Sequence, residues 1–321
     1  MSNPISPLSI ARQLSLSNTA GEQSRVRLRR DIAGLSEQLS SGKRINRASD
    51  DPAGFEQARR LDLLSKELSQ YQRSIGAATK WNNATQNNLD TIIERFARAQ
   101  ELATQAANDT LNDGDRAAIA TELRSLRGEV IDRLNAKLGD EYLFAGNATQ
   151  DPPFDATTGA PNAGYNAIDD ARNRTIGPDQ QLKVNITGEE IHQMDSGDSI
   201  VDALDNLIDA VDPTTPNPPP LGGGPAPADP SDAIQNGLDA VTQARDYVIN
   251  QGTRAGLIAQ RLESATSQLD SAALQADARR SELEDVDFAE AISTLQRKQT
   301  SLQAALQVTA RVKQVSLADF L

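Results

Sequence analysis

The sequence predicts a mainly α-helical protein in which long antiparallel coiled-coil helices, drawn from both ends of the chain, flank a small insert that contains β-structure. The first observation is heptad spacing, because apolar residues recur at alternating steps of three and four in the first and last thirds of the chain. The second is composition, since aromatic residues make up only 3% of the 321 residues. The third is a middle region in which prolines and glycines interrupt the pattern.

The first third of the chain predicts two long helices joined by a polar connector. One helix is expected from about Ser9 to Leu39, and the connector occupies Leu39–Gly54. Asp51 can accept hydrogen bonds from free backbone N–H groups, and Pro52 suits the first position of a helix. A second helix is therefore expected to begin here and to continue to about residue 107.

The centre of the chain is expected to be shorter and more irregular. A turn at residues 108–115 precedes a third helix, which Gly139 ends and which folds back antiparallel on the second. Two strands are predicted beyond it, at 181–186 and at the start of 189–194. A short helix is predicted over 199–211.

The last third of the chain returns to heptad spacing. Residues 213–230 are rich in Pro and Gly and predict a flexible, exposed loop. A long helix is expected from Ser231, and Asp287–Glu290 resembles a capping box that opens a last helix. Pairing the first helix with the last, and the second with the next to last, predicts a terminal-helix domain of residues 1–40 with 288–321, a helical rod of 41–147 with 231–287, and a variable insert of 148–230.

The two terminal helices carry apolar seams that a helix pair alone buries poorly. Exposed apolar stripes normally seek partners, so self-assembly into a ring or fibre is the physical expectation. We expect these seams to be poorly ordered in the free monomer and to order when neighbours cover them. The expected assembly surface consists of Leu28, Ile32 and Leu35 in the first helix and Leu295, Leu302, Leu306 and Val312 in the last.

Composition argues against several classes of function. A net charge of −13 disfavours a nucleic-acid binder, and no apolar run approaches the roughly 18–20 residues that span a membrane. The chain has no Cys and a single His, His192, which is expected to be an ordinary surface residue. Catalytic triads, metal sites and cofactor-binding motifs are therefore not expected, and neither is an enzyme. The first residues lack the features of a cleaved signal, so any secretion is expected to use another route.

Two segments make the chain recognisable. Leu39–Gly54 closely resembles the N-terminal signature of bacterial flagellins and their relatives. Glu284–Glu290, the Gln-rich helix after it and the ending Val315–Leu321 are similar to the matching C-terminal region. The resemblance covers roughly residues 1–147 and 231–321 and leaves the insert outside.

Within this family, two kinds of subunit compete. Gly139–Asn147 followed by Pro152–Phe154 resembles the subunit that joins the hook to the filament, and the Leu-Ala-Asp-Phe-Leu ending suits it better than a filament subunit. The resemblance therefore implies an extracellular structural adaptor at the hook–filament junction, with a filament flagellin as the alternative. It also implies export through the flagellum's own type III pathway.

The resemblance also implies partners. They are further copies of this chain in a ring, the neighbouring hook-associated junction protein, flagellin, and a cytoplasmic export chaperone that covers Leu295, Leu302, Leu306 and Val312. The connector is expected to carry polar contacts between subunits through Lys43, Arg44, Arg47, Asp50 and Asp51. A soluble coiled-coil scaffold or a secretion chaperone remains an alternative of a different class, because heptads alone fit both.

Overall fold

The computed structural model describes residues 7–108, 111–162 and 170–318, with side chains described from residue 21 to residue 311 within those ranges. The chain divides into two compact units. The terminal unit is Met1–Glu67 with Ala272–Leu321, and the central unit is Leu68–Ser271. Long helices dominate both units, as the heptad spacing predicts.

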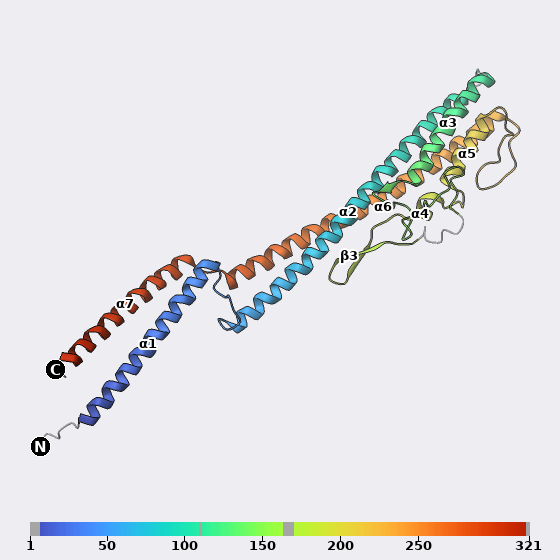
Figure 1. Ribbon diagram of the computed structural model, residues 1–321. Coiled ribbons are helices and arrows are strands. Elements are labelled where there is room, and N and C mark those ends of the chain that lie inside the picture. Colours follow the sequence, from blue (N-terminus) through green and yellow to red (C-terminus); the bar gives the residue numbers. More distant parts are fainter. Residues whose placement is uncertain (1–6, 109–110, 163–169, 319–321) are drawn as a thin grey trace. The chain divides into compact units, whose positions relative to one another are not determined.

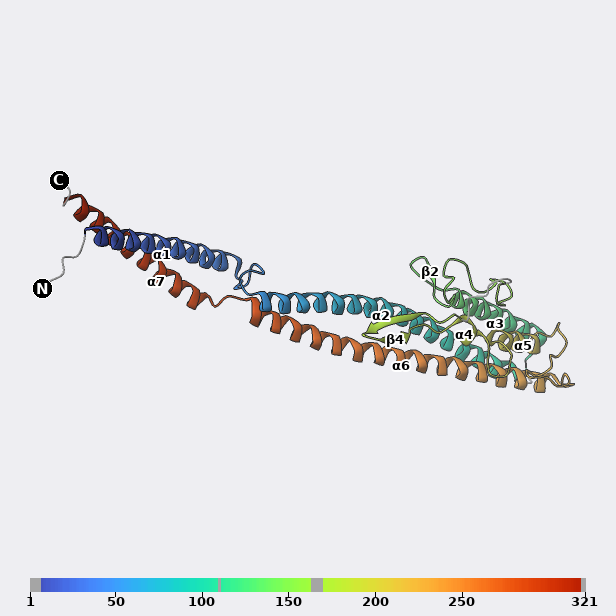
Figure 2. The same cartoon turned by 90° about the horizontal axis from the view of Figure 1, so that it is seen from below.

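The terminal unit contains the first and last helices, α1 (Pro7–Ser41) and α7 (Phe288–Ala318). They lie side by side in both views (Figures 1 and 2), and Lys298 of α7 forms a salt bridge with Asp31 of α1 at 2.6 Å. The expected pairing of first with last is confirmed. Asp287 begins α7 as predicted, since its carboxylate accepts hydrogen bonds from the backbone N–H groups of Ala289 and Glu290 at 2.9 and 3.1 Å.

The longest helices are α2 (Pro52–Ala106) and α6 (Pro230–Glu284). Within the central unit they run antiparallel, because successive contacts pair later residues of α2 with earlier residues of α6. Gln72 reaches Asp270 at 2.7 Å, the buried Asn82 donates to the carbonyl of Ala255 at 3.1 Å, and Gln100 reaches Thr242 at 2.7 Å. The expected pairing of second with next to last is confirmed as well.

Helix α3 (Asp113–Leu134) begins at a full capping box between Asn112 and Asp115. It folds back on α2 as expected, and two salt bridges fix the antiparallel register. Arg95 meets Glu129 at 2.6 Å, and Arg98 meets Glu122 at 2.8 Å.

The prediction that Gly139 ends this helix is wrong. The helix stops at Leu134, and a hairpin of β1 (Lys137–Leu138) and β2 (Glu141–Tyr142) follows. Gly139 lies in the hairpin turn with φ +65°, a conformation that glycine adopts without strain.

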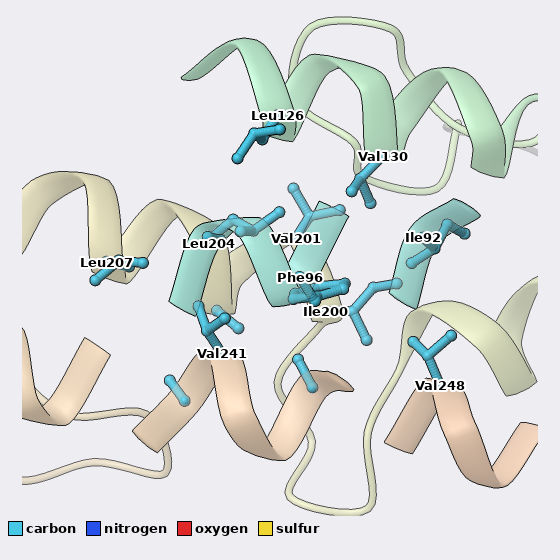
Figure 3. Close-up of a cluster of buried hydrophobic side chains, with 14 of the residues drawn as sticks. Ile92, Phe96, Leu126, Val130, Ile200, Val201, Leu204, Leu207, Val241 and Val248 are labelled. Carbon is cyan, nitrogen blue, oxygen red and sulfur yellow. The ribbon is translucent and has the colours of Figure 1, made fainter. Parts of the chain in front are cut away.

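The main core lies where α2, α3 and α6 meet the short helix α5 (Ile200–Val211). Figure 3 shows Phe96 at the middle of this cluster, with Val130, Ile200 and Val241 around it. Phe96 and Ile200 are fully buried. The insert therefore shares one core with the rod helices, because α5 supplies a strongly apolar face that the rod helices cover.

The insert differs from its sequence prediction in two places. A hairpin of β3 (Asn173–Gly177) and β4 (Gln180–Lys183) replaces the single strand expected at 181–186. The strand expected at the start of 189–194 is instead helix α4 (Gly188–His192). Thr187 and Glu190 form a capping box there, and this local signal outweighs the alternation of polar and apolar residues.

His192 is not an ordinary surface residue. It is buried, with 9% of its surface exposed, and its ring stacks on Phe154 with centroids 5.0 Å apart. Burial lowers the pKa of His192, although the charge of Asp202 and a hydrogen bond with the Gly159 backbone oppose that effect. The residue is part of the packing of the insert.

The loop at 213–230 is irregular and largely exposed, as expected, but internal contacts hold it. Asn206 of α5 donates to the carbonyl of Pro219 at 2.7 Å, and Asn217 donates to that of Pro227 at 3.1 Å. Leu221 packs against the main core. These contacts close the loop onto the central unit.

Candidate assembly surface

The connector between α1 and α2 lies against the turn between α6 and α7. Gly42 leaves α1 with φ +73°, and its carbonyl accepts a hydrogen bond from the Val286 N–H at 3.0 Å. The Arg44 N–H donates to the carbonyl of Glu284 at 2.5 Å. Two backbone hydrogen bonds thus join the connector to a segment about 240 residues away, so the connector and the link between α6 and α7 form one joint.

The basic side chains of the connector strengthen this joint. Lys43 forms a salt bridge with Glu284 at 2.8 Å, and Arg44 donates to the carbonyl of Leu283 at 2.8 Å. Arg47 reaches back to Glu37 of α1 at 2.9 Å. These cations therefore join the connector to α1 and to the end of α6.

The two aspartates shape the connector backbone. One oxygen of Asp50 accepts the N–H groups of Asn46 and Arg47 at 3.1 and 2.8 Å. Asp51 accepts the Gly54 N–H at 2.9 Å, so it caps α2 as the sequence predicts.

A small apolar centre underlies the same connector. Ile45 is 4% exposed. A Cβ added at Gly54 would lie 2.7 Å from Ile45 Cδ1 and 2.5 Å from Asp51 Oδ2, so any larger residue at this position would force these two side chains to shift.

All five predicted connector residues thus take part in contacts within the chain. The basic side chains of Lys43, Arg44 and Arg47 nevertheless remain 51%, 48% and 68% exposed. They hold the joint and still offer charge to a neighbour, so their contacts between subunits remain a proposal.

The predicted apolar seams of α1 and α7 are only half covered in the single chain. Leu28, Ile32 and Leu35 are half-buried, as are Leu295 and Leu302, while Leu306 is 41% exposed. Val312 belongs to α7, but its side chain lies outside the described residues. Among the described side chains of the two helices, only Ala291 is buried. Over the side chains that the structure describes, the pair therefore lacks a closed apolar core of its own.

One flank of α7 carries two exposed apolar residues, Phe288 and Ile292, that the sequence prediction did not single out. Phe288 is 53% exposed and Ile292 is 45% exposed, and with Leu306 they lie on one side of the helix at 100° per residue. Phe288 lies beside the connector, since a Cβ at Gly42 would come within 3.9 Å of its ring. Its position directly after the capping Asp287 was the available signal. We call Phe288, Ile292 and Leu306 the α7 flank.

A surface cavity of about 420 Å³ lies at the joint, between α1, the connector and the start of α7. Leu35 and Gln38 of α1, Arg44 of the connector and Ala291 of α7 line it, together with the carboxylates of Glu282, Asp285, Asp287 and Glu290. Apolar exposure, a hollow and a mixed polar rim thus occur together at the joint, as in surfaces that bind other proteins.

Other kinds of site are not supported by the part of the chain that the structure describes. None of its helices is long and apolar enough to cross a bilayer. Its His, Asp and Glu side chains nowhere form a group that could hold a metal ion.

Comparison with known proteins places this geometry in a family. Flagellar hook-associated protein 3 of Salmonella typhimurium is 34% identical over 171 residues, which cover 51% of this chain and 54% of that protein. The flagellar filament 41 kDa core protein of Borreliella burgdorferi is 37% identical over 100 residues, or 31% of this chain and 30% of that protein. The chain spans about half the length of the curated hook-associated relatives that it matches.

The fold is shared with a solved protein from Vibrio parahaemolyticus that is described as flagellar hook-associated. The TM-score is 0.64 at 22% identity, and the match covers 74% of this chain and all of that one. Residues 13–149 match the bacterial flagellin N-terminal helical region, and residues 238–321 match the C-terminal helical region. Because these two regions together cover more than half of the sequence and flank the insert, the chain belongs to the bacterial flagellin family.

Proposed function

We propose that this chain is a structural subunit of the bacterial flagellum that joins the hook to the filament. It does so by polymerising through α1 and α7, in contact with further copies of itself, with a hook-associated junction protein and with flagellin. Its relatives include hook-associated protein 3 over 171 residues, against 100 residues for the filament core protein. The longer match supports the junction over the filament. The chain acts outside the cell after export through the flagellar type III pathway, and its role is structural, not catalytic.

The observation that carries this proposal is the half-covered helix pair. Fully burying a large apolar side chain contributes about 1.5–3 kcal/mol. Phe288 is 53% exposed and Ile292 is 45% exposed, so covering each in an assembly would contribute about 1 kcal/mol. Summed over every copy in a ring, such contacts drive association while the single chain stays soluble.

The same surface explains why a chaperone would be needed before export. Leu295, Leu302, Leu306 and Val312 lie on α7, and α1 covers the described ones incompletely. A cytoplasmic chaperone that covers these side chains would prevent premature assembly. In the assembled state, the exposed charges of Lys43, Arg44 and Arg47 would meet neighbouring subunits at the joint, while Asp50 and Asp51 hold its shape. In this proposal the terminal-helix domain assembles with neighbouring subunits, and the rod and the insert form the other two domains of the chain.

A deletion tests the proposal directly. Cells without this chain are expected to make hooks, to lack filaments and to release flagellin into the medium. The intact gene restores filaments, whereas L302E/L306E does not, because it places charge on the seam. Ala304 is exposed and lies on the opposite side of α7 from Leu302, so A304E is the matched control and should restore filaments. Full swimming with L302E/L306E would overturn the proposal.

The match to a filament core protein supports filament flagellin as the second candidate. In that case the deletion would remove the bulk filament protein itself, and no other flagellin would accumulate in the medium. A soluble coiled-coil scaffold would give a third result, namely intact filaments and a constitutive dimer at low protein concentration. The three outcomes are distinguishable in one set of strains.

A further inference from the structure

A pocket in the central unit lies far along the sequence from the assembly surface. It opens where α2 meets the β1–β2 hairpin and β3, and its volume is about 220 Å³. Ala78, Trp81 and Val184 form an apolar floor, and each of them is buried. Leu138 stands at the edge and is 37% exposed. Figure 2 shows the strands beside α2 in this unit.

The rim of this pocket is basic, although the chain as a whole has a net charge of −13. Lys80, Arg172 and Arg174 line it with a single carboxylate, Glu141. Glu141 is already engaged, because it forms a salt bridge with Arg172 at 3.1 Å.

The other two cations are exposed and have no carboxylate partner among the residues that the structure describes. Lys80 and Arg174 therefore present two uncompensated positive charges at the mouth of an apolar hollow. An acidic ligand would compensate both.

Trp81, in the floor of the pocket, has one polar contact and one polar group without a partner among the described residues. The guanidinium of Arg172 lies 4.0 Å from the centre of its ring, which is a cation–π contact. Its Nε1–H is buried without a hydrogen-bond acceptor among the described residues, in a side chain only 6% exposed. A buried donor without a partner is costly, and buried Trp side chains usually find one. This observation is independent of the charges at the rim.

The size of the pocket decides what kind of ligand it takes. Pockets for cofactors and drug-sized molecules usually measure about 300–1,000 Å³. A volume of about 220 Å³ suits one or two protruding side chains instead. We propose that this pocket docks an acidic segment of a partner protein, which inserts one apolar side chain over Trp81 and Val184 and places carboxylates on Lys80 and Arg174.

This inference concerns α2 and the insert, so it does not depend on the junction function proposed for α1 and α7. Trp81 is the only tryptophan of the chain, and its fluorescence therefore reports on this pocket alone. The probes are three capped tripeptides, Asp-Leu-Asp, Asp-Ala-Asp and Lys-Leu-Lys, titrated into the full-length protein at low salt with excitation selective for Trp.

Asp-Leu-Asp is expected to produce a saturable change in Trp81 emission. Asp-Ala-Asp should bind more weakly because it lacks the Leu side chain that fills the apolar floor. Lys-Leu-Lys should produce no change in Trp81 emission. In K80E/R174E the affinity for Asp-Leu-Asp should fall at least ~10-fold, because two exposed ion pairs are replaced by repulsion. R60E/R261E changes the net charge equally at two exposed positions outside the pocket and should bind as the wild type does.

Lys80 and Arg174 lie at the surface and have no salt-bridge partner in the described part of the chain, so their substitution spares the core. K80Q/R174Q provides a milder second variant. Absence of any response to Asp-Leu-Asp, or an equal response in all variants, would overturn the proposal. If Trp81 emission changed with protein concentration in the absence of peptide, and K80E/R174E abolished that change, the pocket would bind a second copy of this chain. That result would also overturn the proposal. The gene deletion tests the proposed junction function separately, so neither of these results would change the conclusion drawn from it.

Discussion

Glu190 offers a quantitative test of how the insert is held on the rod. Its carboxylate contacts Lys183 of β4 and Arg254 of α6, both at 2.8 Å, and accepts the Thr187 N–H at 2.9 Å. Its backbone carbonyl accepts a hydrogen bond from the Tyr247 hydroxyl at 2.8 Å. One residue thus links three elements of the central unit. We predict that E190Q loosens this connection.

The size of the effect follows from the pKa of the carboxyl group. Burial by itself raises the pKa of Glu190, but the hydrogen bonds from Lys183 and Thr187 and the charges of Lys183 and Arg254 outweigh it and lower the pKa from 4.5 to about 2. That difference corresponds to about 3 kcal/mol. The side chain is 25% exposed, and solvent screening reduces the expected loss to about 1–2 kcal/mol.

The sign of the pH dependence is fixed by the same values. A carboxyl group with a lowered pKa in the folded state stabilises that state above its unfolded pKa of about 4.5 and loses this contribution as the pH falls towards 2. The stability gap between wild type and E190Q should therefore be full at pH 7 and should narrow below pH 4.5.

Urea unfolding followed by the emission of Trp81 measures this gap, because Trp81 lies in the same unit. Glu189 is the matched control, since it is adjacent and exposed in the same first turn of α4. E189Q should unfold like the wild type. If E190Q unfolds like E189Q at pH 7, or if the gap does not change with pH, the reasoning is refuted.

Two further predictions concern the connector. G54A should destabilise the terminal unit by about 1–3 kcal/mol, because the new Cβ would overlap the side chains of Asp51 and Ile45. The melting of α1 and α7, followed by circular dichroism, measures this loss. An unchanged melting curve would contradict the prediction. K43E should raise the rate of proteolysis at the joint, and K43E/E284K should return that rate to the wild-type value, since the exchanged charges still pair. If the double variant is cleaved as fast as K43E, the 2.8 Å salt bridge is not what holds the joint.

The helical frame was predictable because its determinants are local. Asp51 and Asp287 each cap a helix where the sequence indicates, and heptad spacing predicts which helices pair. The errors arise where two local signals compete. At Gly139 the apolar series continues through Leu138, but the helix has already stopped at Leu134, and Gly139 lies in a hairpin turn instead.

The sites were less predictable because distant residues build them. The connector sequence indicates a joint, but nothing in it reveals that Glu284 is the partner of Lys43. The basic pocket draws Lys80 from α2 and Arg174 from β3, and no spacing rule connects these positions. The burial of His192 could not be read from the sequence, because its buried stacking partner, Phe154, is almost forty residues away.

The central claim is that α1 and α7 form a half-covered pair that is completed only by assembly. Amide hydrogen exchange of the isolated full-length chain, read by mass spectrometry, tests this most directly. Backbone amides of α1 and α7 should exchange at least ~100-fold faster than those of α3 and of α2 near Phe96. The reason is that opening a helix pair without a closed core should require less free energy than opening the main core, by about 3 kcal/mol or more. Equal protection in both units would show that the terminal helices are stable by themselves, and it would contradict the account.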